Sequence, residues 1–133
     1  GQRWVETEPS LKNLDVSLLM WDMRRWLDPT PMPKQRSVIQ FQYPELSPKQ
    51  RFWWLLVGPD AGVDLCSVEP GFDVDLYVST DLRTMTAIWM GWDNVRSARS
   101  ARRMMLTGDR QLATDMQTWL GLSPFAKERK IAS

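Results

Sequence analysis

The fold is decided by residues 73–122, DVDLYVSTDLRTMTAIWMGWDNVRSARSARRMMLTGDRQLATDMQTWLGL. Polar and apolar residues alternate at its start, which predicts a strand with one apolar face. A helix follows, because capping oxygens at 79–81 precede apolar residues at helical spacing and Gly91 suits its end. Next come a shorter helix capped by Asp93 or Asn94 and a brief strand at 104–107. Gly108 and Asp109 are predicted to make a turn and a cap before a last helix, which Gly121 stops.

Upstream of this stretch, the sequence predicts one helix and three strands. The helix begins near Ser10 or Asn13 and ends at 28–29, since proline disfavours helical geometry in the residue before it. Its apolar arc is wide, which indicates cover on two sides or contact with another subunit or a missing domain. Strands are predicted at 37–43, around 63–65, and at FWWLLV (52–57), which we expect to be covered on both faces.

This order of elements predicts an α+β domain and not an alternating α/β repeat. We expect a meander of about five mostly antiparallel strands in a curved sheet, covered by about four helices. A chain of 133 residues holds one such domain. Its expected bounds are 10–126, with 1–9 as a lead-in and 127–133 as a charged, frayed tail.

The composition argues against several functional classes. No histidine is present, so nucleophilic systems that need one and zinc sites built from His and Cys are excluded. The formal charge of +1 gives no general attraction to nucleic acid or to an anionic membrane. A single cysteine and the lack of an apolar span or signal peptide predict a cytoplasmic domain. We expect no enzyme activity, no cofactor and no metal.

Several segments of the chain carry a family resemblance. Residues 73–122 resemble the second half of the sterol carrier protein type two fold, a helix-covered sheet around a lipid-sized cavity. PGFDVDLYVSTDLRTMTAIWMG and WLGLSPFA, with LLMWDMRRWLD and VDLCSVEPGFDVDL upstream, are similar to the C-terminal domain attached to winged-helix transcription regulators of the HxlR type. The resemblance implies a small-molecule sensor that meets DNA only through a missing N-terminal domain.

The abundance of large apolar side chains bears on the cavity. Eight tryptophans and eight methionines suit either an adaptable apolar pocket or a filled core, and composition alone does not separate the two. Each residue taken singly favours the core, but with the resemblance we expect a cavity for a hydrophobic or amphipathic ligand. Its predicted lining is Leu55, Leu76, Val78, Met85, Ile88, Trp89, Leu112, Met116 and Trp119.

A cluster of arginines is the second candidate site. Arg96, Arg99 and Arg103 are predicted to share a helix face, where they could hold a ligand's anionic head group. A solvated face paired with nearby aspartates is the favoured alternative. A nucleic-acid contact is disfavoured, because 97–106 contains no aromatic residue.

Two smaller signals favour structural roles. Asp73 and Asp75 are predicted to point away from the cavity, so they do not form a paired-carboxylate site. Cys66 is predicted to be a buried strand thiol and not a redox sensor. Together with the family resemblance, the sequence favours a ligand-sensing domain of a transcription regulator. The alternative is a dimerisation or spacer module with a filled pocket, for which the partner is a second copy.

Overall fold

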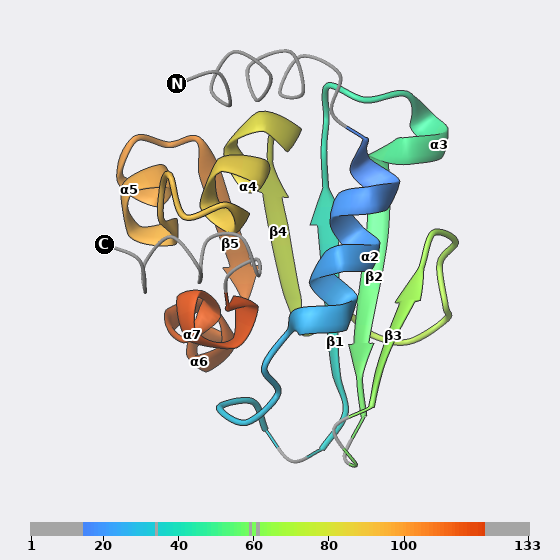
Figure 1. Ribbon diagram of the computed structural model, residues 1–133. Coiled ribbons are helices and arrows are strands. Elements are labelled where there is room, and N and C mark those ends of the chain that lie inside the picture. The colour runs from blue at the N-terminus through green and yellow to red at the C-terminus, as the bar shows by residue number, and fades with distance from the viewer. Residues whose placement is uncertain (1–14, 34, 59, 61, 122–133) are drawn as a thin grey trace.

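The computed structural model describes residues 15–121 apart from 34, 59 and 61. Within these residues, the chain forms five strands and six helices, arranged as a sheet with helices packed against it (Figure 1). In chain order they are α2 (Val16–Trp26), β1 (Ser37–Gln42), α3 (Pro48–Arg51), β2 (Phe52–Val57), β3 (Val63–Cys66), β4 (Leu76–Thr80), α4 (Leu82–Trp89), α5 (Val95–Ser100), β5 (Met104–Gly108), α6 (Arg110–Thr114) and α7 (Met116–Leu120).

The predicted class is confirmed, whereas the helix count differs from about four. The chain is α+β, with three antiparallel strand pairings and one parallel pairing. The predicted last helix divides into α6 and α7 at Asp115, whose backbone leaves helical geometry at φ −91° and ψ 7°. Residues 48–51 add a short helix with Pro48 at its start. The predicted start of the first helix, the lead-in and the tail lie outside the described residues.

The predicted meander is wrong, because β4 does not lie beside β3. The strand order is β3-β2-β1-β4-β5, and β4 runs parallel to β1 with Phe41 opposite Val78. The connection from β3 to β4 therefore crosses the sheet, passing behind β2 and β1 in Figure 1. Asp75 anchors its end, since its N–H donates to the Val38 carbonyl and its carboxylate accepts from the Val38 N–H, both at 2.8 Å.

One face of the sheet carries the core. Alternate residues of the central strands, such as Ile39, Phe41 and Leu55, are fully buried against the helices. Helix α2 covers the side of β1 and β2, and the C-terminal helices cover the side of β4 and β5 (Figure 1). The opposite face is covered only in part, since Trp54 is buried but Phe52 and Leu56 are half-buried. The prediction of full cover for FWWLLV is therefore wrong at these two residues.

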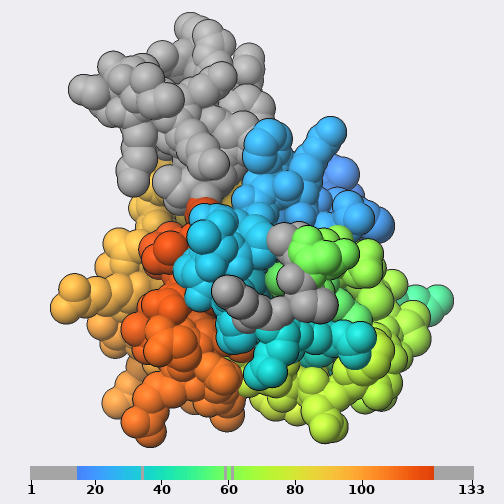
Figure 2. Space-filling view, turned by 90° about the horizontal axis from the view of Figure 1, so that it is seen from below, coloured from blue at the N-terminus to red at the C-terminus, as the bar shows by residue number. Residues whose placement is uncertain are grey.

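The connector between α2 and β1 closes one end of the core. Leu27 and Met32 are buried members of the core cluster. The Asp28 N–H donates to the Trp119 carbonyl at 2.8 Å, which ties the connector to α7. Seen from this end, the connector (cyan) lies directly against α6 and α7 (orange) (Figure 2). The first and last described helices are thus joined through this segment.

Candidate functional site

The structure brings the nine predicted cavity residues together in one core cluster. They come from β2, β4, α4, α6 and α7, and none is more than 2% exposed: Leu55, Leu76, Val78, Met85, Ile88, Trp89, Leu112, Met116 and Trp119. The strand residues face the helix residues across the interior, as the periodicity predicts. A cavity wall and a filled core both bury such side chains, so their role as a lining remains a prediction.

Helix α4 is held in place at both ends. Asp81 caps its start by accepting from the Thr84 N–H at 2.9 Å, and the Glu45 carboxylate accepts from the Leu82 N–H at 2.7 Å. At the other end Gly91 adopts φ 81° and donates to the Ile88 carbonyl, while Trp92 donates to the Ala87 carbonyl. These two bonds form a Schellman motif, so the predicted stop at Gly91 is confirmed.

The inner face of α4 is joined to α2 by a buried polar contact. The Trp89 indole N–H donates to the Asp22 carboxylate at 2.7 Å. Trp89 is 2% exposed, so this bond satisfies a donor that water does not reach. Helices α2 and α4 are therefore fixed relative to one another by hydrogen bonding as well as by packing.

Helices α6 and α7 carry the remaining residues of the cluster. Asp109 caps α6 through the Leu112 N–H at 2.9 Å, which confirms the predicted turn and cap. Gly108 precedes it with φ 127°, and a Cβ there would lie 2.4 Å from the Asp75 carbonyl oxygen, so only glycine fits. Inside, the Trp119 indole N–H donates to the Leu112 carbonyl at 2.9 Å and ties α7 to α6.

A buried tyrosine is a polar feature of the core that the sequence analysis missed. Tyr43 is fully buried, and its hydroxyl donates to the sulfur of Met20 at 3.2 Å. Burial, and to a lesser degree the charge of Glu45, raises the pKa of the Tyr43 phenol far above its usual value, so it stays neutral. The signal was available, because Tyr43 continues the buried face of Ile39 and Phe41.

A groove lies on the surface between α5 and the α6–α7 pair. Its volume is about 530 Å³, and it is lined by Val95, Arg96, Arg99, Ser100, Ala113, Thr114 and Gln117. A second hollow of about 350 Å³ adjoins it at Arg99 and is lined further by Arg102, Met104, Met105 and Leu106. None of the nine predicted cavity residues lines either hollow. Two of the three predicted head-group arginines, Arg96 and Arg99, do line the larger one.

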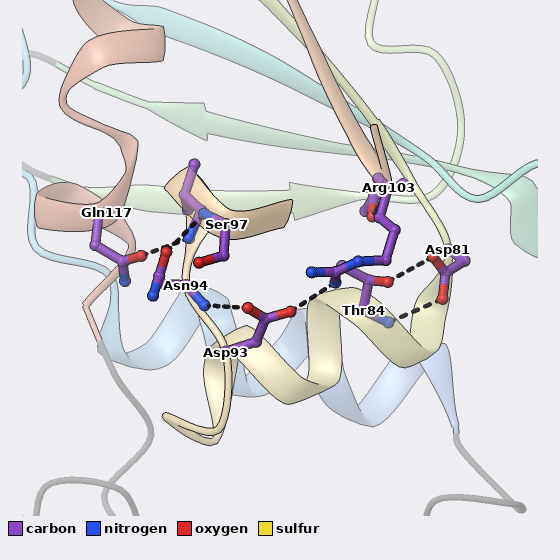
Figure 3. Close-up of polar contacts among 9 residues, drawn as sticks. Asp81, Thr84, Asp93, Asn94, Ser97, Arg103 and Gln117 are labelled. Carbon is purple, nitrogen blue, oxygen red and sulfur yellow. Dashed lines mark hydrogen bonds and ion pairs between the residues drawn. The ribbon is translucent and has the colours of Figure 1, made fainter. Parts of the chain in front are cut away.

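The third predicted head-group residue, Arg103, does not share their helix face. Helix α5 ends at Ser100, and Arg102 adopts φ 61°, which turns the chain away before Arg103. The expectation of one helical face for all three arginines is therefore wrong. Arg103 instead forms an ion pair with Asp93 at 2.6 Å (Figure 3). The Arg103 carbonyl accepts from the Thr80 hydroxyl at 2.8 Å.

The ion pair with Arg103 controls the protonation of Asp93. Partial burial opposes ionisation of Asp93, but hydrogen bonds from Arg103 and from the Asn94 N–H outweigh it and lower the carboxyl pKa. Asp93 therefore carries its charge at neutral pH. The pairing of an arginine with a nearby aspartate, which the alternative predicted, is thus observed for Arg103.

Helix α5 is positioned by side chains at its first turn. The Asn94 side chain accepts from the Ser97 N–H at 2.7 Å, so Asn94 is the cap that the sequence left open. The Gln117 side-chain oxygen accepts from the Val95 N–H at 2.8 Å and joins α5 to α7 (Figure 3). Because that oxygen faces a donor, the amide orientation is set and Nε2 is left as a donor.

The sequence analysis missed five residues of the groove: Val95, Ser100, Ala113, Thr114 and Gln117. A partial signal existed, since Val95 and Arg99 are four residues apart and so share a face of α5. The packing of α5 beside α6 and α7 joins segments that are distant in the chain, so the spacing of neighbouring residues does not predict it. The sequence could therefore place the arginines on a helix but not beside a groove.

Two further predictions concern single residues and classes of site. Cys66 is a half-buried free thiol in β3, less covered than expected. Across residues 15–121, with the gaps stated above, no group of three or more His, Cys, Asp or Glu side chains could hold a metal ion. In the same part of the chain, no helix combines the length and apolar character that a membrane crossing needs.

Comparison with known proteins identifies the fold. No protein-family model and no curated protein matches the chain. Among solved structures, palmitated Sterol Carrier Protein 2 Like 2 from Aedes aegypti has a TM-score of 0.53 at 20% identity, over 81% of this chain and 94% of that chain. The UbiJ-SCP2 ubiquinone synthesis protein has a TM-score of 0.51 at 14% identity, over 74% of both chains. This chain has the sterol carrier protein fold.

A larger protein contains the same fold as a part. A double mutant of the sec-alkyl sulfatase PisA1 has a TM-score of 0.66 at 14% identity, over 86% of this chain but 17% of that chain. The match therefore covers a domain-sized segment of the sulfatase. It concerns the fold alone, as do the two matches above.

Proposed function

We propose that this domain binds a hydrophobic or amphipathic small molecule between the sheet and the C-terminal helices. The observation that carries the proposal is the buried cluster itself. Nine apolar side chains from five elements converge there, and they include the adaptable thioethers of Met85 and Met116 and the indoles of Trp89 and Trp119. The same fold in the palmitated Aedes aegypti protein supports a fatty acid as the first ligand to try.

The binding test uses the intrinsic tryptophans. Palmitate and an environment-sensitive apolar dye are titrated into the purified domain while tryptophan emission is followed, and native mass spectrometry checks for co-purified lipid. We expect saturable binding with a shift in emission, since Trp89 and Trp119 lie within the cluster. An absence of binding by both probes, together with lipid-free purified protein, would contradict the proposal.

A pair of variants on one strand localises the binding. Val78→Phe adds volume on the buried face of β4, whereas Tyr77→Phe changes the neighbouring residue on the other face, where Tyr77 is 39% exposed. Palmitate affinity should fall in Val78→Phe and persist in Tyr77→Phe, with circular dichroism confirming that both are folded. Equal affinities in the two variants would move the site away from the cluster.

We propose further that binding is sensed within a transcription regulator. This part rests on the sequence resemblance to the C-terminal domain of the HxlR-type winged-helix proteins. A ligand shifts such a regulator only if it binds two arrangements of the helices with different affinity. The test measures DNA binding by a chain that carries the winged helix, with and without palmitate. Equal duplex affinity in both conditions would leave ligand binding in place and remove the regulatory role.

A second candidate function, a dimerisation or spacer module with a filled pocket, is favoured by one specific observation. Leu18 and Trp21 on the outer face of α2 are 69% and 51% exposed. Sedimentation velocity of the domain and of Leu18→Ser/Trp21→Ser separates this function from ligand binding. A dimer that the double variant abolishes, with no lipid bound, would favour the module.

A further inference from the structure

The groove between α5 and the α6–α7 pair combines two positive charges with a lining free of carboxylates. Arg96 and Arg99 are three residues apart on α5, so their side chains lie on the same side of the helix. Within the described residues, the ion pair is formed by Arg103 and Asp93, and neither residue lines the groove. Both arginines thus bring positive charge to one concave surface, and an anion bound there would be attracted to both.

The remaining polar groups of the groove also suit an anion. The hydroxyls of Ser100 and Thr114 can donate hydrogen bonds, and Gln117 retains Nε2 as a donor because its oxygen accepts from Val95. Arginine presents a planar fork of donors that matches the oxygens of a carboxylate or a phosphate. The lining of the groove therefore includes residues of α5, α6 and α7 that can donate hydrogen bonds.

The surroundings of the groove indicate an anion with an organic part. Arg99 also borders the second hollow, whose lining includes Met104, Met105 and Leu106. Met105 is 65% exposed, so a flexible apolar surface begins directly beside the cationic one.

We infer that this groove is a binding site for an oxyanion, a carboxylate or phosphate group, held by Arg96 and Arg99. The apolar portion of an amphipathic anion lies along Met105 and Leu106. The site is on the outer side of the helices and does not depend on a ligand in the core. The oxyanion can belong to the head group of an amphiphile or to a soluble anion, and the two sources differ in whether an apolar chain adds affinity.

The test titrates the domain with inorganic phosphate, decanoate and the uncharged decanol at constant ionic strength. Nitrogen–proton correlation spectra follow the Nε–H signals of the arginines for the groove and the indole N–H of Trp119 for the core. We expect decanoate and phosphate to shift the signals of Arg96 and Arg99, and decanol to leave them unchanged. Tighter binding of decanoate than of phosphate identifies an amphiphile head group, whereas equal affinities identify a soluble anion, and both uphold the site.

Matched variants decide whether the two arginines carry the binding. Arg96→Gln/Arg99→Gln removes both groove charges, and Arg25→Gln/Arg83→Gln removes the same net charge from exposed positions on α2 and α4. The first pair should weaken anion binding about a hundredfold, since it removes two charged hydrogen bonds that each contribute about one factor of ten. The second pair should leave it within about twofold, which is the effect of general screening alone.

Two outcomes overturn the inference. One is the absence of arginine shifts with both phosphate and decanoate; the other is equal loss of affinity in the two double variants. Decanoate that shifts only the Trp119 indole, while phosphate shifts no arginine signal, is a form of the first outcome and would place the ligand in the core. Anion binding at the groove without any core ligand would uphold this inference while the proposed function fails.

Discussion

Helices α2 and α5 are held to the same domain by different forces. Helix α2 has 11 residues and buries Val16, Leu19, Met20 and Met23 in the core. Helix α5 has six residues and buries only Val95 and Ala98, so hydrogen bonds at its ends hold it instead. Apolar burial is worth more than such contacts, so we expect α5 to open before α2. The two groove arginines are thus carried by a helix with less apolar anchoring than α2.

The largest expected effect tests whether α2 is anchored by its buried face. Met23→Ala should destabilise the domain by about 2–5 kcal/mol, because it removes a fully buried side chain and leaves a cavity. Leu18→Ala on the exposed face of the same helix should cost about 0.5 kcal/mol or less. Urea unfolding curves measure both. Similar losses in the two variants would mean that the two faces of α2 are not packed differently.

The next effect concerns the polar link between α2 and α4. Asp22→Ala should cost about 1–3 kcal/mol, because the buried Trp89 indole N–H loses its acceptor. Asp22→Asn keeps an acceptor oxygen at the same position and should recover most of that loss. The free energy of unfolding reports the difference. An equal cost for both variants would indicate that the carboxylate charge matters and not the hydrogen bond.

A smaller effect tests whether α5 depends on its first turn. Asn94→Ala should cost about 1 kcal/mol, since it removes the cap on the Ser97 N–H. Asn94→Asp retains the capping oxygen and serves as the control. Amide hydrogen exchange should accelerate in α5 and stay unchanged in α2. Equal acceleration of exchange in both helices would contradict the expected difference in stability between α2 and α5.

The smallest effect is the pH dependence of the Asp93–Arg103 pair. The pKa of Asp93 is lowered in the folded state from its usual 3.8, so the pair stabilises the domain above about that pH. Its contribution is lost as the pH falls through the lower folded-state pKa. Asp93→Asn should therefore cost about 1 kcal/mol or less at neutral pH and progressively less in acid. A pH-independent difference between the two proteins would show that the charge of Asp93 contributes nothing.

Prediction from sequence succeeded where short-range chemistry decides the outcome. Strands β2 and β5, the caps at Asp81 and Asp109, and the stop at Gly91 were all expected from neighbouring residues. The buried faces of β4 and of the C-terminal helices were also expected, because periods of two and of 3.6 residues report directly which side chains share a face. For the candidate cavity, this was enough to predict the buried side chains of four elements, which the structure counts as five because the last helix divides at Asp115.

Prediction failed where distant segments decide the outcome. The parallel pairing of β4 with β1 depends on Asp75 meeting Val38, 37 residues away, and no local pattern encodes that choice. Arg103 was placed on a helix face because local spacing cannot foresee the positive φ of Arg102. The groove likewise needs α5 to pack beside α6 and α7.

For this protein, amino-acid order was sufficient to specify the elements, their caps and their apolar sides, since each follows from interactions within a few residues. The choice of strand neighbours, the pairing of Arg103 with Asp93 and the joining of Arg96 and Arg99 to a concave surface arose only when the chain packed. The physical reason is that burial and Coulomb interactions act through space, and their partners are set by the whole fold.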